Sequence, residues 1–133
     1  MILIDSSVWI DYFRGNSTPK TERLDALLIE GPVAVADLVL AEVLQGCVQE
    51  KEFRRQLALM GRFPMIEVAG LDIAIQAARN YRFLRAKGIT IRKTIDTLIA
   101  TRCIMDGHTL LYSDRDFDPF VEHLGLISAM RPN

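Results

Sequence analysis

The segment Met1–Ser7, Met-Ile-Leu-Ile-Asp-Ser-Ser, decides how the chain is expected to fold and where its chemistry lies. Its four leading apolar residues predict a short buried strand that ends at the carboxylate of Asp5. Ser6 or Ser7 is expected to cap a helix running to about Arg14, because a hydroxyl accepts a hydrogen bond from an unpaired first-turn amide. The segment therefore predicts a strand, an acidic side chain and a helix in immediate succession.

Short strands and helices are expected to alternate along the rest of the chain. The expected strands are 33–36, 65–68, 109–112 and 126–128, and the expected helices are 20–30, 37–47, 50–62, 71–87, 94–105 and 117–124. This alternation predicts an α/β sandwich with a mainly parallel central sheet of about four or five short strands and helices on both faces. Because no linker or repeat interrupts the pattern, residues 1–133 are expected to form a single domain.

The composition is that of a soluble globular protein. Of 133 residues, 50% are hydrophobic and 25% are charged, and 16 Lys+Arg against 17 Asp+Glu give a formal net charge of −1. This balance argues against nucleic-acid binding through overall positive charge. Apolar runs such as 33–36 are far shorter than the roughly 20 residues of a membrane span, so no membrane segment is expected. Cys47 and Cys103 are expected to be buried free thiols, which suggests the cytoplasm.

Two acidic side chains follow predicted strands. Asp5 ends the first strand, and Asp114 comes shortly after the strand 109–112. In parallel α/β sheets ligands gather beyond the carboxyl ends of the strands. If these two strands are neighbours, both carboxylates project at the same edge; taken singly, either acid is equally well explained as a helix cap or a turn residue.

Three further acids have both a structural and a functional interpretation. Glu42 lies in the apolar helix 37–47, where a carboxylate is costly unless it is paired or bound to metal, or else faces solvent at the helix edge. Asp96 lies in the first turn of its helix, where the helix dipole alone stabilises it by about 0.3–1 kcal/mol. Asp116 belongs to a turn before another helix. Together with Asp5 and Asp114 they are an all-oxygen set without a His or Cys cluster, which favours Mg²⁺ or Mn²⁺.

Other common chemistries lack their sequence patterns. No Gly-rich loop ending in Gly-Lys-Ser/Thr is present, which excludes a P-loop nucleotide site, and no G-x-S-x-G marks a serine hydrolase. His108 and His123, with two distant cysteines, do not have the spacing of a zinc site. A hard cation held by carboxylates, which activates water and stabilises charge on a phosphodiester, is the chemistry that the residues favour.

Four motifs in order resemble the PIN-domain ribonucleases, most closely the VapC toxins of bacterial toxin–antitoxin pairs. They are Ile-Leu-Ile-Asp-Ser-Ser at 2–7, Leu-Ala-Glu-Val-Leu at 40–44, Thr-Ile-Asp-Thr-Leu at 94–98 and Ser-Asp-Arg-Asp-Phe at 113–117. The resemblance implies a PIN-like sandwich whose acids hold Mg²⁺ or Mn²⁺ at one sheet edge. It assigns metal coordination to Asp5, Glu42, Asp96 and Asp114 and adds Asp116 as a fifth catalytic acid. Ser7 is implied to orient water or a ligand, or simply to cap its helix.

The resemblance also implies an activity and partners. VapC proteins are endoribonucleases that cut structured RNA such as tRNA or rRNA, are blocked by a small VapB antitoxin, contact operator DNA only through that antitoxin, and commonly form homodimers. Metal-assisted hydrolysis is expected, with Glu42 either ligating the metal or acting as general base. Two alternatives stay open: a PIN-domain RNA-processing nuclease without an antitoxin, and a non-catalytic PIN domain that binds RNA or protein. The intact set of acids counts against the second.

Residues 73–95 contain no acid and six bases, and they lead directly into Asp96. We predict that this stretch guides RNA phosphates toward the acidic pocket, although a solvated helix face is an equally simple explanation. The six bases are Arg79, Arg82, Arg85, Lys87, Arg92 and Lys93.

Overall fold

A five-stranded sheet forms the centre of the computed structural model, which describes residues 1–130. The last three residues of the expected 1–133 domain therefore lie outside the described part. All paired strands run parallel, in the order β3-β2-β1-β4-β5, which confirms the predicted α/β class. The strands are β1 (Ile2–Ile4), β2 (Val33–Ala36), β3 (Met65–Ile66), β4 (Thr109–Leu111) and β5 (Ile127–Ser128).

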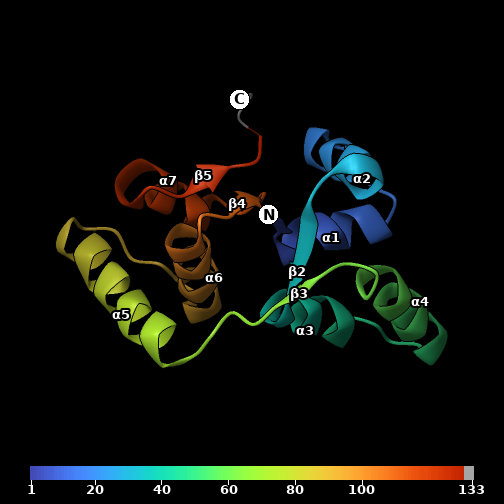
Figure 1. The fold of residues 1–133 in the computed structure, drawn as a ribbon, viewed down its shortest axis with the longest axis horizontal. Helices are drawn as coiled ribbons and strands as arrows, with labels where there is room; N and C mark the ends of the chain where they lie inside the picture. The colour runs from blue at the N-terminus through green and yellow to red at the C-terminus, as the bar shows by residue number, and fades with distance from the viewer. Residues whose placement is uncertain (131–133) are drawn as a thin grey trace.

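Helices cover both faces of the sheet, as predicted. The chain steps from β1 through β2 to β3 in one direction and then returns through β4 to β5 in the other. Because parallel crossovers are right-handed, the first four helices and the last three must lie on opposite faces; Figure 1 shows α5, α6 and α7 on the left and α1, α2 and α4 on the right. The helices are α1 (Ser6–Phe13), α2 (Pro19–Glu30), α3 (Asp37–Gln45), α4 (Glu50–Met60), α5 (Leu71–Ala86), α6 (Thr94–Asp106), α7 (Asp118–Leu124) and the short 3₁₀ helix η1 (Arg115–Phe117).

The strand order reverses between β1 and β4. Ile4 pairs with Leu111 in register, and the amide of Asp5 donates to the carbonyl of Leu111 at 2.8 Å. The two chain segments that leave these strands therefore start side by side at the carboxyl edge of the sheet. In open α/β sheets this is the position where ligands bind.

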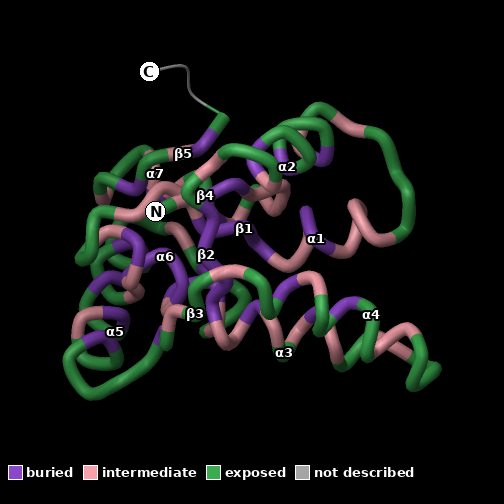
Figure 2. Tube along the Cα trace, turned by 45° about the vertical axis from the view of Figure 1, so that its right-hand side comes forward, coloured by how far each residue is buried: buried purple, intermediate pink, exposed green. Residues whose placement is uncertain are grey.

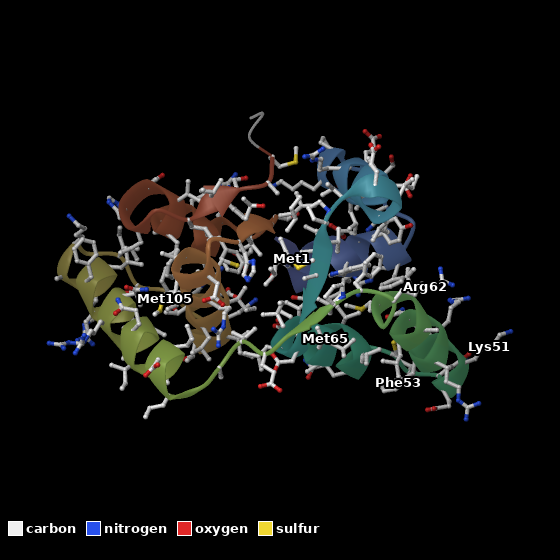
Figure 3. The ribbon with its side chains drawn as sticks, viewed as in Figure 1. Met1, Lys51, Phe53, Arg62, Met65 and Met105 are labelled. Carbon is white, nitrogen blue, oxygen red and sulfur yellow. The ribbon has the colours of Figure 1, made fainter. Side chains whose placement is uncertain are left out.

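The central strand β2 consists only of apolar residues because it lies in the core. All four residues of β2 are buried, because helices pack on both faces of a central parallel strand. Trp9 of α1 is fully buried, and its ring stacks on Phe13 at 5.7 Å between centroids. Figure 2 shows burial concentrated on the strands and exposure on the outer turns of α4 and α5. Lys51 and Arg62, at the two ends of α4, are exposed and point away from the sheet (Figure 3).

The capping of α1 differs from the prediction, and α3 begins with a long-range contact. Asp5 itself, and not Ser6 or Ser7, caps α1, because its carboxylate accepts from the Ser7 amide. Asp37 is the first residue of α3, and its Oδ1 accepts from the amides of Leu38 at 2.8 Å and Val68 at 3.0 Å. The carboxylate thus joins α3 to the segment after β3.

Other boundaries differ by a few residues. The strands predicted over 65–68, 109–112 and 126–128 are shorter, and the helix predicted over 117–124 is preceded by η1. The capping box at Thr18 and Thr21, with Pro19 in the first turn, begins α2. Cys47 and Cys103 are free thiols, as predicted, but only Cys103 is buried, while Cys47 is partly exposed. Within residues 1–130, no helix has the length and apolarity needed to cross a membrane.

Candidate active site

Asp5 lies where β1 passes into α1 and is only 3% exposed. Its Oδ2 accepts from the Ser7 hydroxyl at 2.6 Å and from the Ser7 amide at 3.3 Å. Burial raises the pKa of this carboxyl, the hydrogen bonds from Ser7 and Ser6 lower it, and the charge of Asp114 raises it further; the balance is a raised pKa. Asp5 is therefore fixed in orientation but costly to keep ionised without a cation.

Asp96, Asp114 and Asp116 form the tightest acidic group among the described residues. One carboxylate oxygen from each lies within 4.8 Å of the others. Asp114 follows β4 and caps η1, with its Oδ1 accepting from the Asp116 amide at 2.9 Å, while Asp96 comes from the first turn of α6. The sheet edge, the start of α6 and η1 thus bring three predicted site acids together, including Asp116.

Asp96 has the largest pKa shift among these acids. The residue is 3% exposed, and its Oδ2 is buried without a hydrogen-bond partner. Its pKa is raised to about 7, first by burial and then by the charges of Asp5, Asp114 and Glu42, while Lys93 opposes the rise. A carboxylate placed in this way lacks the partner that a buried charge requires.

Glu42 of α3 has a similar, weaker signature. It is half-buried, and its Oε1 has no hydrogen-bond partner. Burial raises its pKa first, the charge of Asp5 raises it next, and the Ser6 side chain and Lys93 lower it. Glu42 and Asp5 lie outside the 4.8 Å group of three, but their charges act on each other and on Asp96.

Two of the six predicted basic residues face the acids directly. Lys93 Nζ lies 3.6 Å from Asp114 Oδ2, and Arg92 Nε donates to Asp116 Oδ2 at 3.1 Å. The other four are exposed on α5 or just after it: Arg79, Arg82, Arg85 and Lys87. Arg85 lies over the Tyr81 ring at 5.7 Å. The carboxyl-terminal end of the basic stretch therefore contacts the acidic group.

The donor chemistry of this site fits a hard divalent cation. Each acid offers only oxygen, and two of those oxygens, Asp96 Oδ2 and Glu42 Oε1, are buried without a hydrogen-bond partner. Clustered carboxylates repel one another, which the raised pKa of Asp96 reflects, and a cation removes that repulsion. Mg²⁺ and Mn²⁺ prefer oxygen ligands of this kind.

The chain matches a known family over most of its length. The model of the PIN domain matches residues 2–121. The chain belongs to the PIN-domain family. This PIN domain is 32% identical, over 97% of its length and 98% of theirs, to the VapC ribonuclease Mb1587 of Mycobacterium bovis and to ribonuclease VapC11 of Mycobacterium tuberculosis.

Solved structures share the fold of this PIN domain. VapBC2 from Rickettsia felis, bound to a DNA fragment from their promoter, superposes with a TM-score of 0.75 at 20% identity, covering 96% of this chain and 97% of that chain. A toxin–antitoxin complex from Klebsiella pneumoniae gives a TM-score of 0.70 at 19% identity and the same coverage. FitAcB from Neisseria gonorrhoeae gives 0.69 at 20% identity, covering 96% of each chain. At these identities the likeness shows the fold.

Two contacts of this PIN domain were not anticipated from its sequence. Ser6, expected only as a possible helix cap, hydrogen bonds through its side chain to Glu42 and lowers the pKa of that carboxyl. Lys93, expected to bind RNA, also pairs with Asp114. The sequence could have indicated both residues, because Ser6 is next to Asp5 and Lys93 is three residues before Asp96. The partner of each is determined by the fold.

Proposed function

We propose that this chain is a metal-dependent endoribonuclease of the VapC type that cuts structured cellular RNA such as tRNA or rRNA. The observation that carries the proposal is the group formed by Asp96, Asp114 and Asp116 beside Asp5, at the reversal point of a PIN-domain sheet. The relatives that match nearly the whole chain are named ribonucleases. Clustered carboxylates whose pKa values are raised by burial and by mutual repulsion are expected at a site that binds a cation.

Asp5, Glu42, Asp96 and Asp114 are the proposed metal ligands, with Asp116 as a fifth catalytic acid. Mg²⁺ or Mn²⁺, when bound, would lower the pKa of a bound water and stabilise the negative charge of the phosphodiester. The close approach of Asp116 to Asp96 and Asp114 favours including it in the site.

The chain's own residues have distinct roles in the proposed hydrolysis. Ser7 fixes the orientation of Asp5 through its 2.6 Å hydrogen bond. Glu42, whose pKa is raised, is suited to accept a proton from the attacking water as general base, or to act as a ligand. Lys93 and Arg92, each paired with an acid of the site, are placed to bind RNA phosphates beside it.

We further propose a small VapB-type antitoxin as the inhibitory partner. The solved structures with this fold include VapBC2 from Rickettsia felis, with DNA from their promoter, and a toxin–antitoxin complex from Klebsiella pneumoniae. By this analogy, operator DNA is contacted through the antitoxin, and the chain forms a homodimer in the cytoplasm.

The test is expression of the protein without an antitoxin in growing bacteria, followed by mapping of new RNA 5′ ends. New ends in tRNA or rRNA, absent from cells that express Asp5→Asn at the same level, support the proposal. Ends confined to precursor RNA, without growth arrest, favour the RNA-processing alternative. Identical maps for the two proteins, with both folded, reject ribonuclease activity.

A further inference from the structure

A groove of about 550 Å³ lies between α5 and α6, outside the acidic site. The two helices pack side by side, with α5 on the side of α6 away from the strands (Figure 1). The groove exists because α5 presents the small side chains Ala74, Ala77 and Ala78 to it, leaving space that larger residues would fill. Its volume is within the range of sites that bind small organic ligands or single nucleotides.

The walls of the groove combine apolar surface with positive charge. Leu98 and Tyr81 line it beside the alanines, and Arg82 and Arg85 complete one side. Arg85 lies over the Tyr81 ring at 5.7 Å, so a guanidinium and an aromatic ring form one surface. Nucleobases stack on aromatic rings and on guanidinium planes, and phosphates pair with arginine.

Thr97 adds an unsatisfied polar group to this lining. The residue is 3% exposed, and its hydroxyl has no hydrogen-bond partner, although buried hydroxyls are usually paired. A hydroxyl both donates and accepts, so it matches the mixed donor and acceptor edge of a nucleobase. This observation is independent of the shape and charge of the groove.

The groove is adjacent to the acidic site along the chain. Thr97 follows Asp96 directly, and Arg92 and Lys93, which pair with acids of the site, lie in the segment that joins α5 to α6. Cationic side chains therefore occur at the groove and again at the acids. No Asp or Glu is among the residues that line the groove, a charge distribution that fits a polyanion better than an acidic protein segment.

We propose that this groove binds one unpaired nucleotide of the RNA beside the cleaved phosphodiester, its base against Tyr81 and the alanines and its phosphate on Arg82. The inference rests on the proposed function and refines it: the substrate must present an unpaired base, such as one in a loop, next to the cut. A second copy of this chain and an antitoxin segment are the competing occupants.

The test measures binding of a short fluorescein-labelled single-stranded RNA of mixed sequence to the full chain in EDTA, by anisotropy. Ala78→Leu, which fills the groove from an exposed position, and Arg82→Ala should each weaken binding about tenfold, as expected for loss of one stacked base or its phosphate contact. Ala58→Leu on α4 and Arg23→Ala on α2 are matched controls, exposed but outside the groove, and should stay within about twofold of the wild type. Arg82→Ala should also reduce the salt dependence of binding by about one unit of slope.

Unchanged RNA binding by Ala78→Leu and Arg82→Ala, or no binding by the wild type, overturns the proposal. So does a change confined to oligomeric state or to antitoxin binding, because it assigns the groove to a protein. The wild type's cleavage of purified tRNA and rRNA with Mn²⁺ separates the two proposals. If it binds through the groove but does not cut, the proposed function fails and the groove survives; if it cuts and the groove variants bind normally, only the groove fails.

Discussion

The Ser7 hydroxyl donates a 2.6 Å hydrogen bond to Oδ2 of Asp5, at the point where β1 passes into α1. This bond and the bond from the Ser7 amide oppose the effect of burial on the pKa of Asp5. Ser7 is therefore a positioning residue, which acts on the site through Asp5.

Ser7→Ala should lower cleavage about tenfold near neutral pH and less at higher pH, because the pKa of Asp5 rises when the hydroxyl is removed. The measurement is the pH dependence of RNA cleavage with Mn²⁺. Ser17→Ala, in the exposed loop before α2, is the control and should match the wild type. A parallel loss at every pH would show that Ser7 acts only in folding.

Asp96→Asn should stabilise the ion-free protein. Its pKa is raised from 3.8 to about 7, so the folded protein keeps a proton that the unfolded chain has released. The resulting cost is absent below pH 3.8, grows as the pH rises toward about 7 and is complete above it. Removing the charge should raise the free energy of unfolding by roughly 1–2 kcal/mol at about pH 8, measured with urea in EDTA.

Excess Mn²⁺ supplies the matched comparison for Asp96→Asn. The ion should stabilise the wild type, which binds it, and should have much less effect on the variant. A variant that is less stable than the wild type in EDTA at high pH would mean that the Asp96 carboxylate is structurally satisfied.

Affinity for Mn²⁺ should increase with pH. Below about pH 7 the cation must displace the proton on Asp96, so affinity should rise roughly tenfold per pH unit there and level off above. Calorimetry in two buffers of different ionisation enthalpy measures both the affinity and the proton released. A constant affinity between about pH 6 and about pH 7 would contradict a protonated Asp96.

The sequence predicted the elements and the positions of Asp5 and Asp114 after their strands well, because both depend on local pattern. The strand at Ile2–Ile4, the helix after Thr18-Pro19 and the position of Asp5 and Asp114 after their strands all follow from short-range rules. The strand order does not, since it depends on which apolar faces pack in three dimensions. Whether Asp5 and Asp114 share an edge was therefore conditional until the register of Ile4 with Leu111 was known.

Long-range hydrogen bonds were missed for the same reason. Asp37 lies in the first turn of α3, yet its Oδ1 accepts a hydrogen bond from the amide of Val68, thirty-one residues away. The pairing of Lys93 with Asp114 likewise joins the start of α6 to the segment after β4. A local sequence pattern can single out each of these residues, but it does not indicate which of them pair.

Asp37→Ala should destabilise the fold by about 1–3 kcal/mol, because it leaves the amide of buried Val68 without a partner. Chemical denaturation measures the change. Asp72→Ala removes an exposed acid from the first turn of α5, so only its interaction with the helix dipole is lost, at a cost of about 0.3–1 kcal/mol. Equal effects of the two substitutions would remove the structural role assigned to Asp37.

The central claim is that this PIN domain cuts RNA with a cation held by its acidic group. The most direct measurement is cleavage of purified tRNA and rRNA by the ion-depleted protein, titrated with Mn²⁺ or Mg²⁺, for the wild type and Asp96→Asn. We predict no cleavage in EDTA, recovery by the wild type as the ion is added, and at least a hundredfold lower rate for the variant at every ion concentration, about the loss expected from removing a key electrostatic group. Cleavage that persists in EDTA, or a variant as active as the wild type, would contradict the account.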